Sequence, residues 1–81
     1  MKTIIEQIVE IIAREFGIEE NKITPQTNLT RDFGSDSLNQ IRVIIGLEEQ
    51  FDLQISDVEA VKIETVQDAV DYVTERSKAP V

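Results

Sequence analysis

The chain has 81 residues, contains no cysteine, histidine or tryptophan, and carries 16 acidic against 8 basic side chains, which gives a net charge of −8. This charge disfavours nucleic acid as a partner and favours proteins with basic docking surfaces. The length fits one small domain, and the lack of cysteine excludes a disulfide framework. The sequence has no apolar stretch long enough to span a membrane and no signal-peptide pattern, so we expect a cytoplasmic protein.

The first predicted helix ends at Phe16. Thr3 and Glu6 form a capping-box pattern, in which the two side chains accept hydrogen bonds from the first backbone N–H groups. Gly17 favours the end of this helix. Apolar residues recur at helical spacing and predict one buried face, which consists of Ile4, Ile5, Ile8, Val9, Ile12 and Phe16.

Residues 18–35 break this pattern and predict a long loop, with Pro25, Asn28 and Gly34 as typical loop residues. A loop of this length rarely stays ordered without anchors. We therefore expect apolar side chains to pin it to the core, namely Ile23, Leu29 and Phe33.

A second helix is predicted from Asp36 to near Phe51, because apolar residues return there at helical spacing: Leu38, Ile41, Ile44, Ile45, Leu47 and Phe51. Ser56 and Glu59 form another capping-box pattern and open a short third helix that ends near Val61. The last helix begins at Thr65, with an inward face made of Val66, Ala69, Val70 and Val73.

Strand-like alternation is absent from the sequence, so the predicted fold is all-α. We expect a small four-helix bundle with three main helices, one short helix and a long first loop. Residues 1–76 form the predicted domain, and residues 77–81 form a frayed tail.

The most informative segment is Gly34-Ser35-Asp36-Ser37-Leu38, a glycine turn that places Ser37 in the first turn of the second helix. The positive end of a helix dipole and the backbone N–H groups of a first turn favour an anion. The position therefore suits a phosphorylated or phosphodiester-bearing oxygen, and Ser37 is a candidate for covalent modification. The alternative for Asp36 and Ser37 is a plain helix cap.

A serine hydrolase is the rival interpretation of Ser37, and the sequence argues against it. A serine hydroxyl needs a base, and a chain without histidine cannot assemble a Ser-His-acid arrangement. No lysine is adjacent to Ser37 in sequence, which leaves only a Ser–Lys pair formed by folding, and G-S-D-S differs from the G-x-S-x-G pattern of hydrolases. We expect a chain that is not an enzyme. We also predict no specific metal site, because the acidic residues lack EF-hand spacing.

The D-S-L motif at 36–38 is followed by L-E-E-Q-F-D at 47–52 and by I-S-D-V-E-A-V-K-I-E-T-V-Q-D-A-V-D-Y at 55–72. In this order and spacing, the three blocks resemble the acyl carrier protein family. The resemblance implies that a phosphopantetheinyl transferase attaches a 4′-phosphopantetheine arm from coenzyme A to Ser37, and that the arm's thiol holds an acyl group as a thioester. It also implies that Asp36 and Leu38 belong to the attachment site, and that acyltransferases and ketosynthases are partners.

Two alternatives to an acyl carrier remain open. A peptidyl or aminoacyl carrier is disfavoured because aspartate before the serine is more typical of acyl carriers. A small helical interaction module, with Ser37 unmodified, is the alternative of a different class.

The second helix has more apolar residues than one buried stripe needs. Leu38, Ile41 and Ile45 share a face, which we expect to be an exposed partner-binding strip beside Ser37; burial in the core is the alternative. The charged residues of the same predicted surface are Arg42, Glu48 and Glu49. An acyl chain is expected to enter a cleft among Ile44, Leu47, Ile63 and Val66.

Four positions depart from the pattern of housekeeping fatty-acid carriers. Asn39 and Arg42 stand where that pattern has acidic residues, Ser56 replaces a common proline, and Gly46 replaces a common alanine. A glycine inside a helix costs about 1 kcal/mol relative to alanine, which indicates either close packing or room for a bound chain at Gly46. We expect a monomeric, specialised carrier that serves fatty-acid, polyketide or related synthesis.

Overall fold

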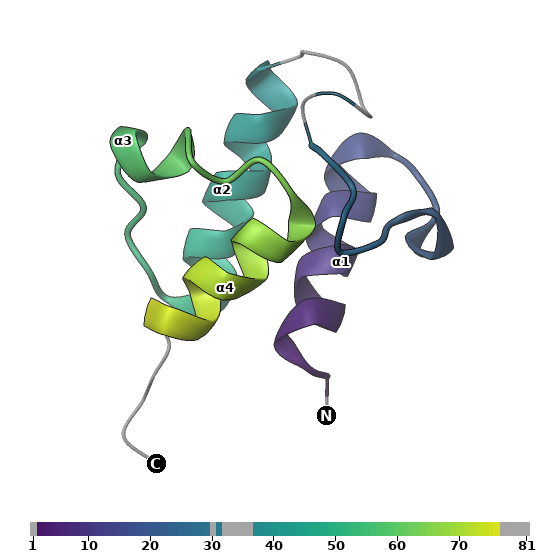
Figure 1. Ribbon diagram of the computed structural model, residues 1–81, viewed down its shortest axis with the longest axis horizontal. Helices are drawn as coiled ribbons and strands as arrows, with labels where there is room; N and C mark the ends of the chain where they lie inside the picture. The colour runs from purple at the N-terminus through teal and green to yellow at the C-terminus, as the bar shows by residue number, and fades with distance from the viewer. Residues whose placement is uncertain (1, 30, 32–36, 77–81) are drawn as a thin grey trace.

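The computed structural model describes residues 2–29, 31 and 37–76, with only the backbone of Ser37 (Figure 1). It contains α1 (Ile4–Phe16), the 3-10 turn η1 (Glu20–Lys22), α2 (Ser37–Phe51), α3 (Asp57–Ala60) and α4 (Val66–Arg76). No strand occurs within these residues, where one isolated β-bridge joins Asn28 and Thr65. The all-α prediction, with three main helices and one short helix, is confirmed. The predicted tail at 77–81 lies outside the described residues.

Local capping fixes both ends of α1 as the sequence predicts. The Thr3 hydroxyl accepts a hydrogen bond from the Glu6 amide (3.2 Å), and the Glu6 carboxylate accepts one from the Thr3 amide (2.9 Å). Gly17 adopts a left-handed conformation with φ of 66°, and its N–H donates to the carbonyl of Ala13. These bonds satisfy backbone groups that a helix leaves without intrahelical partners.

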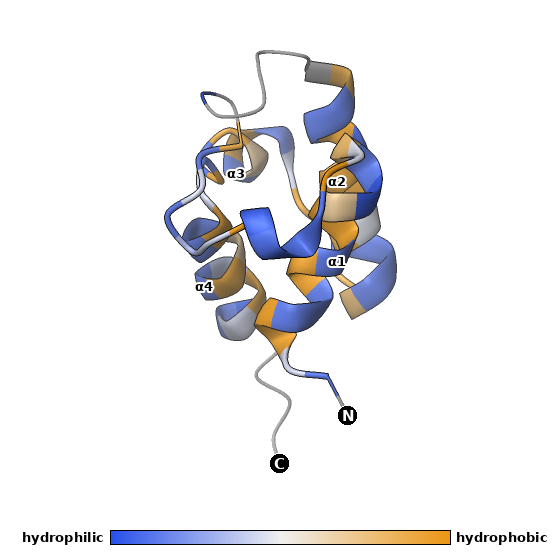
Figure 2. Ribbon diagram, turned by 90° about the vertical axis from the view of Figure 1, so that its right-hand side faces the viewer, coloured by the Kyte–Doolittle hydropathy of each residue, from blue (hydrophilic) through white to orange (hydrophobic). Residues whose placement is uncertain are grey.

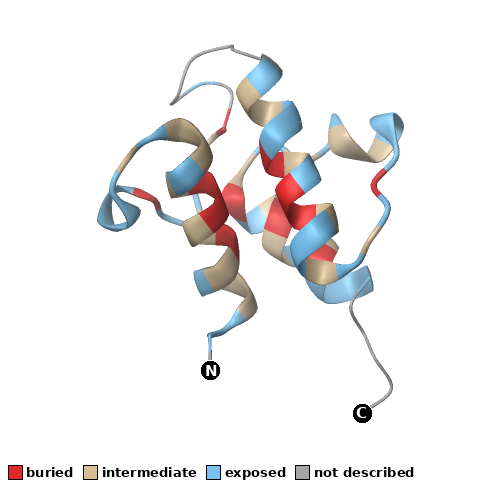
Figure 3. Ribbon diagram, turned by 180° about the vertical axis from the view of Figure 1, so that it is seen from behind, coloured by how far each residue is buried: buried red, intermediate tan, exposed pale blue. Residues whose placement is uncertain are grey.

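The core lies where α1 packs against both α2 and α4. Apolar segments of the helices face one another in Figure 2, and the buried positions in Figure 3 gather along these inner faces. Two loop residues complete the core as predicted, whereas the third predicted anchor, Phe33, lies outside the described residues. The buried apolar residues are Ile8, Ile11, Ile12, Ile23, Leu29, Val43, Leu47, Ile55, Val66, Ala69 and Val73.

Gly46 allows a close approach of α1 and α2. A Cβ atom placed on this buried glycine would lie 2.9 Å from Cγ2 of Ile11, well inside the 3.5–4.0 Å optimum for two carbon atoms. Of the two explanations for Gly46, the structure supports close packing. This close packing also explains why Ile11 is buried, although the predicted apolar face of the first helix did not include it.

Backbone hydrogen bonds join the loop between η1 and α2 to the start of α4. The amides of Val66 and Gln67 donate to the carbonyls of Thr27 (3.1 Å) and Pro25 (2.9 Å). In the opposite direction, the amide of Leu29 donates to the carbonyl of Glu64 (2.8 Å). The described part of this long loop is therefore held by the backbone of a distant segment as well as by its buried side chains.

Candidate functional site

Ser37 is the first residue of the 15-residue helix α2. The first turn of α2 contains no acidic side chain, so no carboxylate within that turn neutralises the positive end of the helix dipole. A serine at this place offers a hydroxyl that can form a phosphodiester beside a helix terminus that favours anions. Gly34 and Asp36, the other predicted members of this segment, lie outside the described residues.

Five large apolar side chains are exposed among the described residues. Three lie on α2 downstream of Ser37: Leu38 is 52% exposed, Ile41 53% and Ile45 45%. The predicted exposure of this strip is confirmed, and the alternative that these residues belong to the core is wrong. The other two, Val58 (68%) and Val61 (74%), belong to α3 and the residue after it, and their exposure was not predicted from the sequence. Their spacing of three residues on a capped helix is the signal that could have found them.

A groove of about 420 Å³ separates α2 from α3 and is open to the surface. Its lining combines apolar and polar side chains: Gln40, Ile41, Ile44, Ile45, Glu48, Ile55, Asp57, Ala60 and Val61. Two residues of the exposed strip, Ile41 and Ile45, therefore also form one wall of the groove. Val61 stands on the opposite wall.

The four residues predicted for the acyl-chain cleft do not line one hollow. Ile44 lines the groove between α2 and α3, whereas Ile63 lines a second hollow of about 400 Å³ between α3 and α4. Leu47 and Val66 are fully buried in the core. Ile44 and Ile63 are partly buried and pack against that same core, so the four residues are near neighbours of one cluster.

The charged residues of the predicted partner surface differ in their surroundings. Arg42 and Glu49 are exposed, and Asn39 is half-buried. Glu48 is half-buried, and its carboxylate accepts a hydrogen bond from the amide of Ile55 at 2.8 Å. Glu48 therefore fixes the segment that leads into α3, in addition to the docking role expected from the sequence.

No group of three histidine, cysteine, aspartate or glutamate residues within the described ranges could hold a metal ion. Over the same part of the chain, no helix has the length and apolar character needed to cross a membrane.

Comparison with known proteins places this chain beside a family model and a relative that each match most of it. The family model described as "Phosphopantetheine attachment site" matches residues 6–73, which extend from the first turn of α1 into α4. A protein named acyl carrier protein, from Cyanidioschyzon merolae (strain NIES-3377 / 10D), is 37% identical over 76 residues. That alignment covers 94% of this chain and 84% of its relative. The matched region contains α2 and the groove described above.

Proposed function

This chain belongs to the acyl carrier protein family, and we propose that Ser37 is the residue to which its 4′-phosphopantetheine cofactor is attached. Members of this family are carriers rather than enzymes, and their partners are acyl-processing enzymes. When bound, the cofactor supplies a flexible arm with a thiol that holds an acyl group as a thioester. The observation that carries the proposal is the place of Ser37, in the D-S-L motif and at the first residue of α2. A hydroxyl beside a helix N-terminus fits a phosphodiester.

The groove between α2 and α3 supports a proposal for the cargo. An acyl chain lying in it contacts Ile44 on the inner side and Ile41, Ile45 and Val61 at the walls. Each Å² of apolar surface that leaves water contributes about 25 cal/mol. A longer chain reaches toward Ile63 and the buried Leu47 and Val66 only if the core side chains move, since the last two have no exposed surface.

The exposed strip of α2 supports a proposal for the partners. Leu38, Ile41 and Ile45 offer apolar contact close to the start of the helix, and Arg42 and Glu49 offer exposed charges on the same element. We expect a phosphopantetheinyl transferase, acyltransferases and ketosynthases to dock here, with Glu48 and Asp36 contributing to the same surface. Asn39 and Arg42 favour a specialised carrier of fatty-acid, polyketide or related synthesis. We expect a cytoplasmic monomer.

Attachment is tested by incubating the protein with coenzyme A, magnesium and a broad-specificity phosphopantetheinyl transferase, followed by intact mass spectrometry. The wild type should gain one arm, and Ser37→Ala should gain none. Ser56→Ala is the matched control, because Ser56 also lies at the start of a helix and should leave the modification unchanged. Modification that persists in Ser37→Ala, or that is lost in Ser56→Ala, contradicts the assignment.

Cargo binding is tested by loading the arm with acyl chains of increasing length and measuring Tm. A ligand that binds only the native state raises Tm. The Tm should therefore rise with chain length until the groove is filled. Equal Tm values for the holo and acyl forms would show that the chain stays in solvent, and would also leave a non-acyl cargo, such as an aminoacyl group, as the better hypothesis.

A further inference from the structure

The short helix α3 forms the outer wall of the groove, yet it has little core of its own. It spans four residues, none of which is buried, and Asp57, Ala60 and the following Val61 line the groove. Isolated helices of this length are not stable in water, because nucleation costs more than one turn of hydrogen bonds returns. The position of the wall therefore depends on contacts with the rest of the protein.

Several contacts hold the two ends of α3. The Ser56 hydroxyl accepts a hydrogen bond from the Glu59 amide (3.2 Å) and caps the helix. Upstream, the buried Ile55 donates its amide to Glu48 of α2. On the inner side, Ala60 and Ile63 pack against the core. Glu59 lies on the side of α3 that faces α4, and its carboxylate also accepts a hydrogen bond from the Ser56 hydroxyl (3.2 Å).

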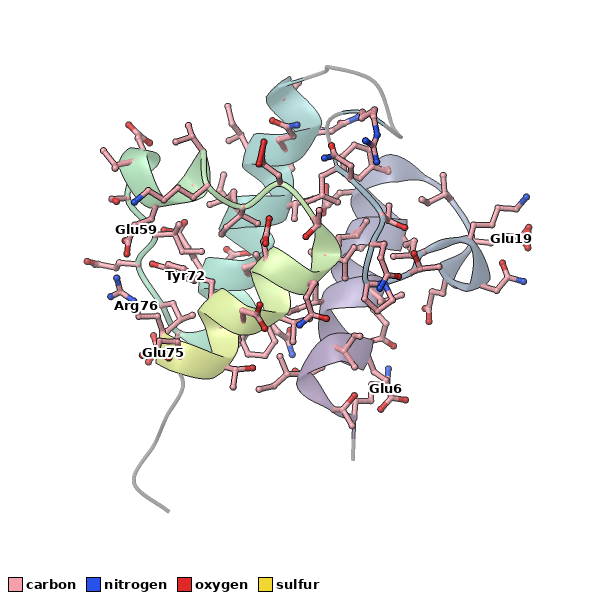
Figure 4. All side chains as sticks on the ribbon, viewed as in Figure 1. Glu6, Glu19, Glu59, Tyr72, Glu75 and Arg76 are labelled. Carbon is pink, nitrogen blue, oxygen red and sulfur yellow. The ribbon has the colours of Figure 1, made fainter. Side chains whose placement is uncertain are left out.

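Glu59 belongs to a cluster of three side chains, together with Tyr72 and Arg76, that lies between α3 and α4 (Figure 4). Arg76, in the last turn of α4, pairs its guanidinium with the Glu59 carboxylate. The same guanidinium carbon lies 5.1 Å from the centroid of the Tyr72 ring, within the range of a cation–π interaction. Arg76 thus forms an ion pair with Glu59 of α3 and a cation–π contact with Tyr72 of its own helix, α4.

The proximity of these groups shifts the pKa values of Glu59 and Tyr72. The Tyr72 hydroxyl is the main cause that lowers the pKa of the Glu59 carboxyl, and Arg76 adds to it. Burial is the main cause that raises the pKa of Tyr72, Glu59 raises it further, and Arg76 opposes this. Within the described structure the Tyr72 hydroxyl oxygen is buried and makes no hydrogen bond of acceptable geometry.

We propose that Arg76 is a positioning residue that holds α3 in place through Glu59 and Tyr72, and thereby sets how readily the groove between α2 and α3 opens to a bound chain. The part of this inference that concerns cargo rests on the proposed acyl-carrier function. A planar guanidinium can pair with a carboxylate and stack on a ring at once, which a lysine ammonium does less well.

Loss of the pair between Arg76 and Glu59 should change the rate at which α3 opens only modestly. Arg76 and Glu59 have side chains that are 49% and 28% exposed, and ion pairs at such sites stabilise weakly. Local opening, however, depends on the few contacts of the segment that opens, and α3 has few. We expect loss of the pair to speed the opening of α3 by about two- to fivefold, which corresponds to the weak coupling of exposed pairs.

The first experiment uses the unmodified protein, so that it does not depend on cargo. Amide hydrogen exchange is measured for Ala60 and Val61, whose N–H groups donate to Ser56 and Asp57. Arg76→Gln should accelerate their exchange by about two- to fivefold, and Arg76→Lys should lie between Arg76→Gln and the wild type. Equal exchange in Arg76→Gln and the wild type would overturn the proposal.

Arg14→Gln is the matched control for a change of charge. Arg14 also lies in the last turn of its helix and pairs with a glutamate, but that helix is α1. The control should leave the exchange of α3 unchanged, and the amides of Ile11 and Ile12 should not respond to Arg76→Gln. A uniform acceleration that includes α1, or an equal effect of Arg14→Gln, would mean that Arg76 contributes only to overall stability and would also overturn the proposal.

The second readout is the ionisation of Tyr72, the one tyrosine in a chain without tryptophan, which makes its absorbance change unambiguous. Arg76→Gln should raise the pKa of Tyr72 further, because the guanidinium opposes the other influences. Glu59→Gln should lower it. Shifts in the same direction for both variants, or none, would show that the three side chains do not form a cluster in solution.

The third measurement repeats the Tm series of acyl forms in Arg76→Gln. The rise in Tm on acylation should be smaller than in the wild type, because a looser wall holds the chain less well. An equal rise in both proteins would refute control of the groove by Arg76. If acylation raises Tm in neither protein, the proposed cargo site fails, and the exchange of α3 in the unmodified protein still decides whether Arg76 positions that helix.

Discussion

Gly46→Ala tests whether the α1–α2 contact is as close as the structure shows. The substitution adds one methyl group at a buried position on α2, directly opposite Ile11 of α1. In a helix the change from glycine to alanine alone stabilises by about 0.8–1.0 kcal/mol. The packing acts in the opposite direction, so the sign of the net effect depends on the contact.

The packing penalty follows from one distance. The new Cβ atom would lie 2.9 Å from Cγ2 of Ile11, whereas carbon atoms normally approach to about 3.5–4.0 Å. Cγ2 is attached directly to the branched Cβ of isoleucine, whose χ1 is restricted in a helix, so it cannot swing away easily. Overpacking of this kind costs about 1–3 kcal/mol, which exceeds the helix-propensity gain. We expect a net loss of about 1 kcal/mol and a decrease in Tm of roughly 4–8 °C for a domain of this size.

Thermal and urea unfolding of four proteins gives a decisive assay: wild type, Gly46→Ala, Ile11→Leu and the double variant. Leucine keeps the volume of isoleucine but has no Cγ2 atom, and such swaps usually cost less than about 1.5 kcal/mol. In the Ile11→Leu background, Gly46→Ala should therefore raise Tm, because the propensity gain remains without the close contact. An increase in Tm from Gly46→Ala in the wild-type background would refute the reasoning.

Acid should destabilise the protein in part through Glu6 and Glu59, whose pKa values folding lowers below 4.5, chiefly through the Thr3 amide and the Tyr72 hydroxyl respectively. The stabilisation from these two carboxylates is fully present above their pKa in the unfolded chain and is lost as pH falls through their lower pKa in the folded protein. Replacing both with glutamine should therefore flatten the acidic limb of a plot of Tm against pH. Asp52 follows α2 with φ of 55°, so Asp52→Gly should raise Tm by about 2–4 °C, with Asp52→Asn separating the effect of charge from that of conformation. The double change Asn39→Asp with Arg42→Glu should increase turnover by housekeeping elongation enzymes at low salt, with a gain that shrinks as salt rises. No gain at any salt concentration would remove the main support for a specialised carrier.

Local signals predicted most of the helical boundaries. The pairing of Thr3 with Glu6, the glycine at 17 and the serine at 56 each act within one turn of the chain, and the structure confirms the helix end that each of them marks. The turn η1 was not predicted, since three polar residues carry neither a periodic pattern nor a cap. The contacts of Pro25 and Thr27 with α4 join distant segments, and periodicity along the chain carries no information about them.

The site shows the same division between local and distant information. Helical spacing was sufficient to identify Leu38, Ile41 and Ile45 as one exposed face of α2. It was not sufficient to decide which apolar residues border an open groove, because that depends on where α3 lies relative to α2. The partnership of Arg76 with Glu59 also depends on tertiary packing, since an arginine near the end of a helix is usually only a solvated charge.

The hydrogen bonds between the first loop and α4 make the last helix depend on an early part of the chain. The amides of Val66 and Gln67 open α4, and their acceptors, Thr27 and Pro25, precede α2 and α3 in sequence. The first turn of α4 is complete only after the chain has closed a large loop, whose entropic cost must be met before these bonds form. A single proteolytic cut between Pro25 and Leu29 should therefore loosen a helix that the protease never touches.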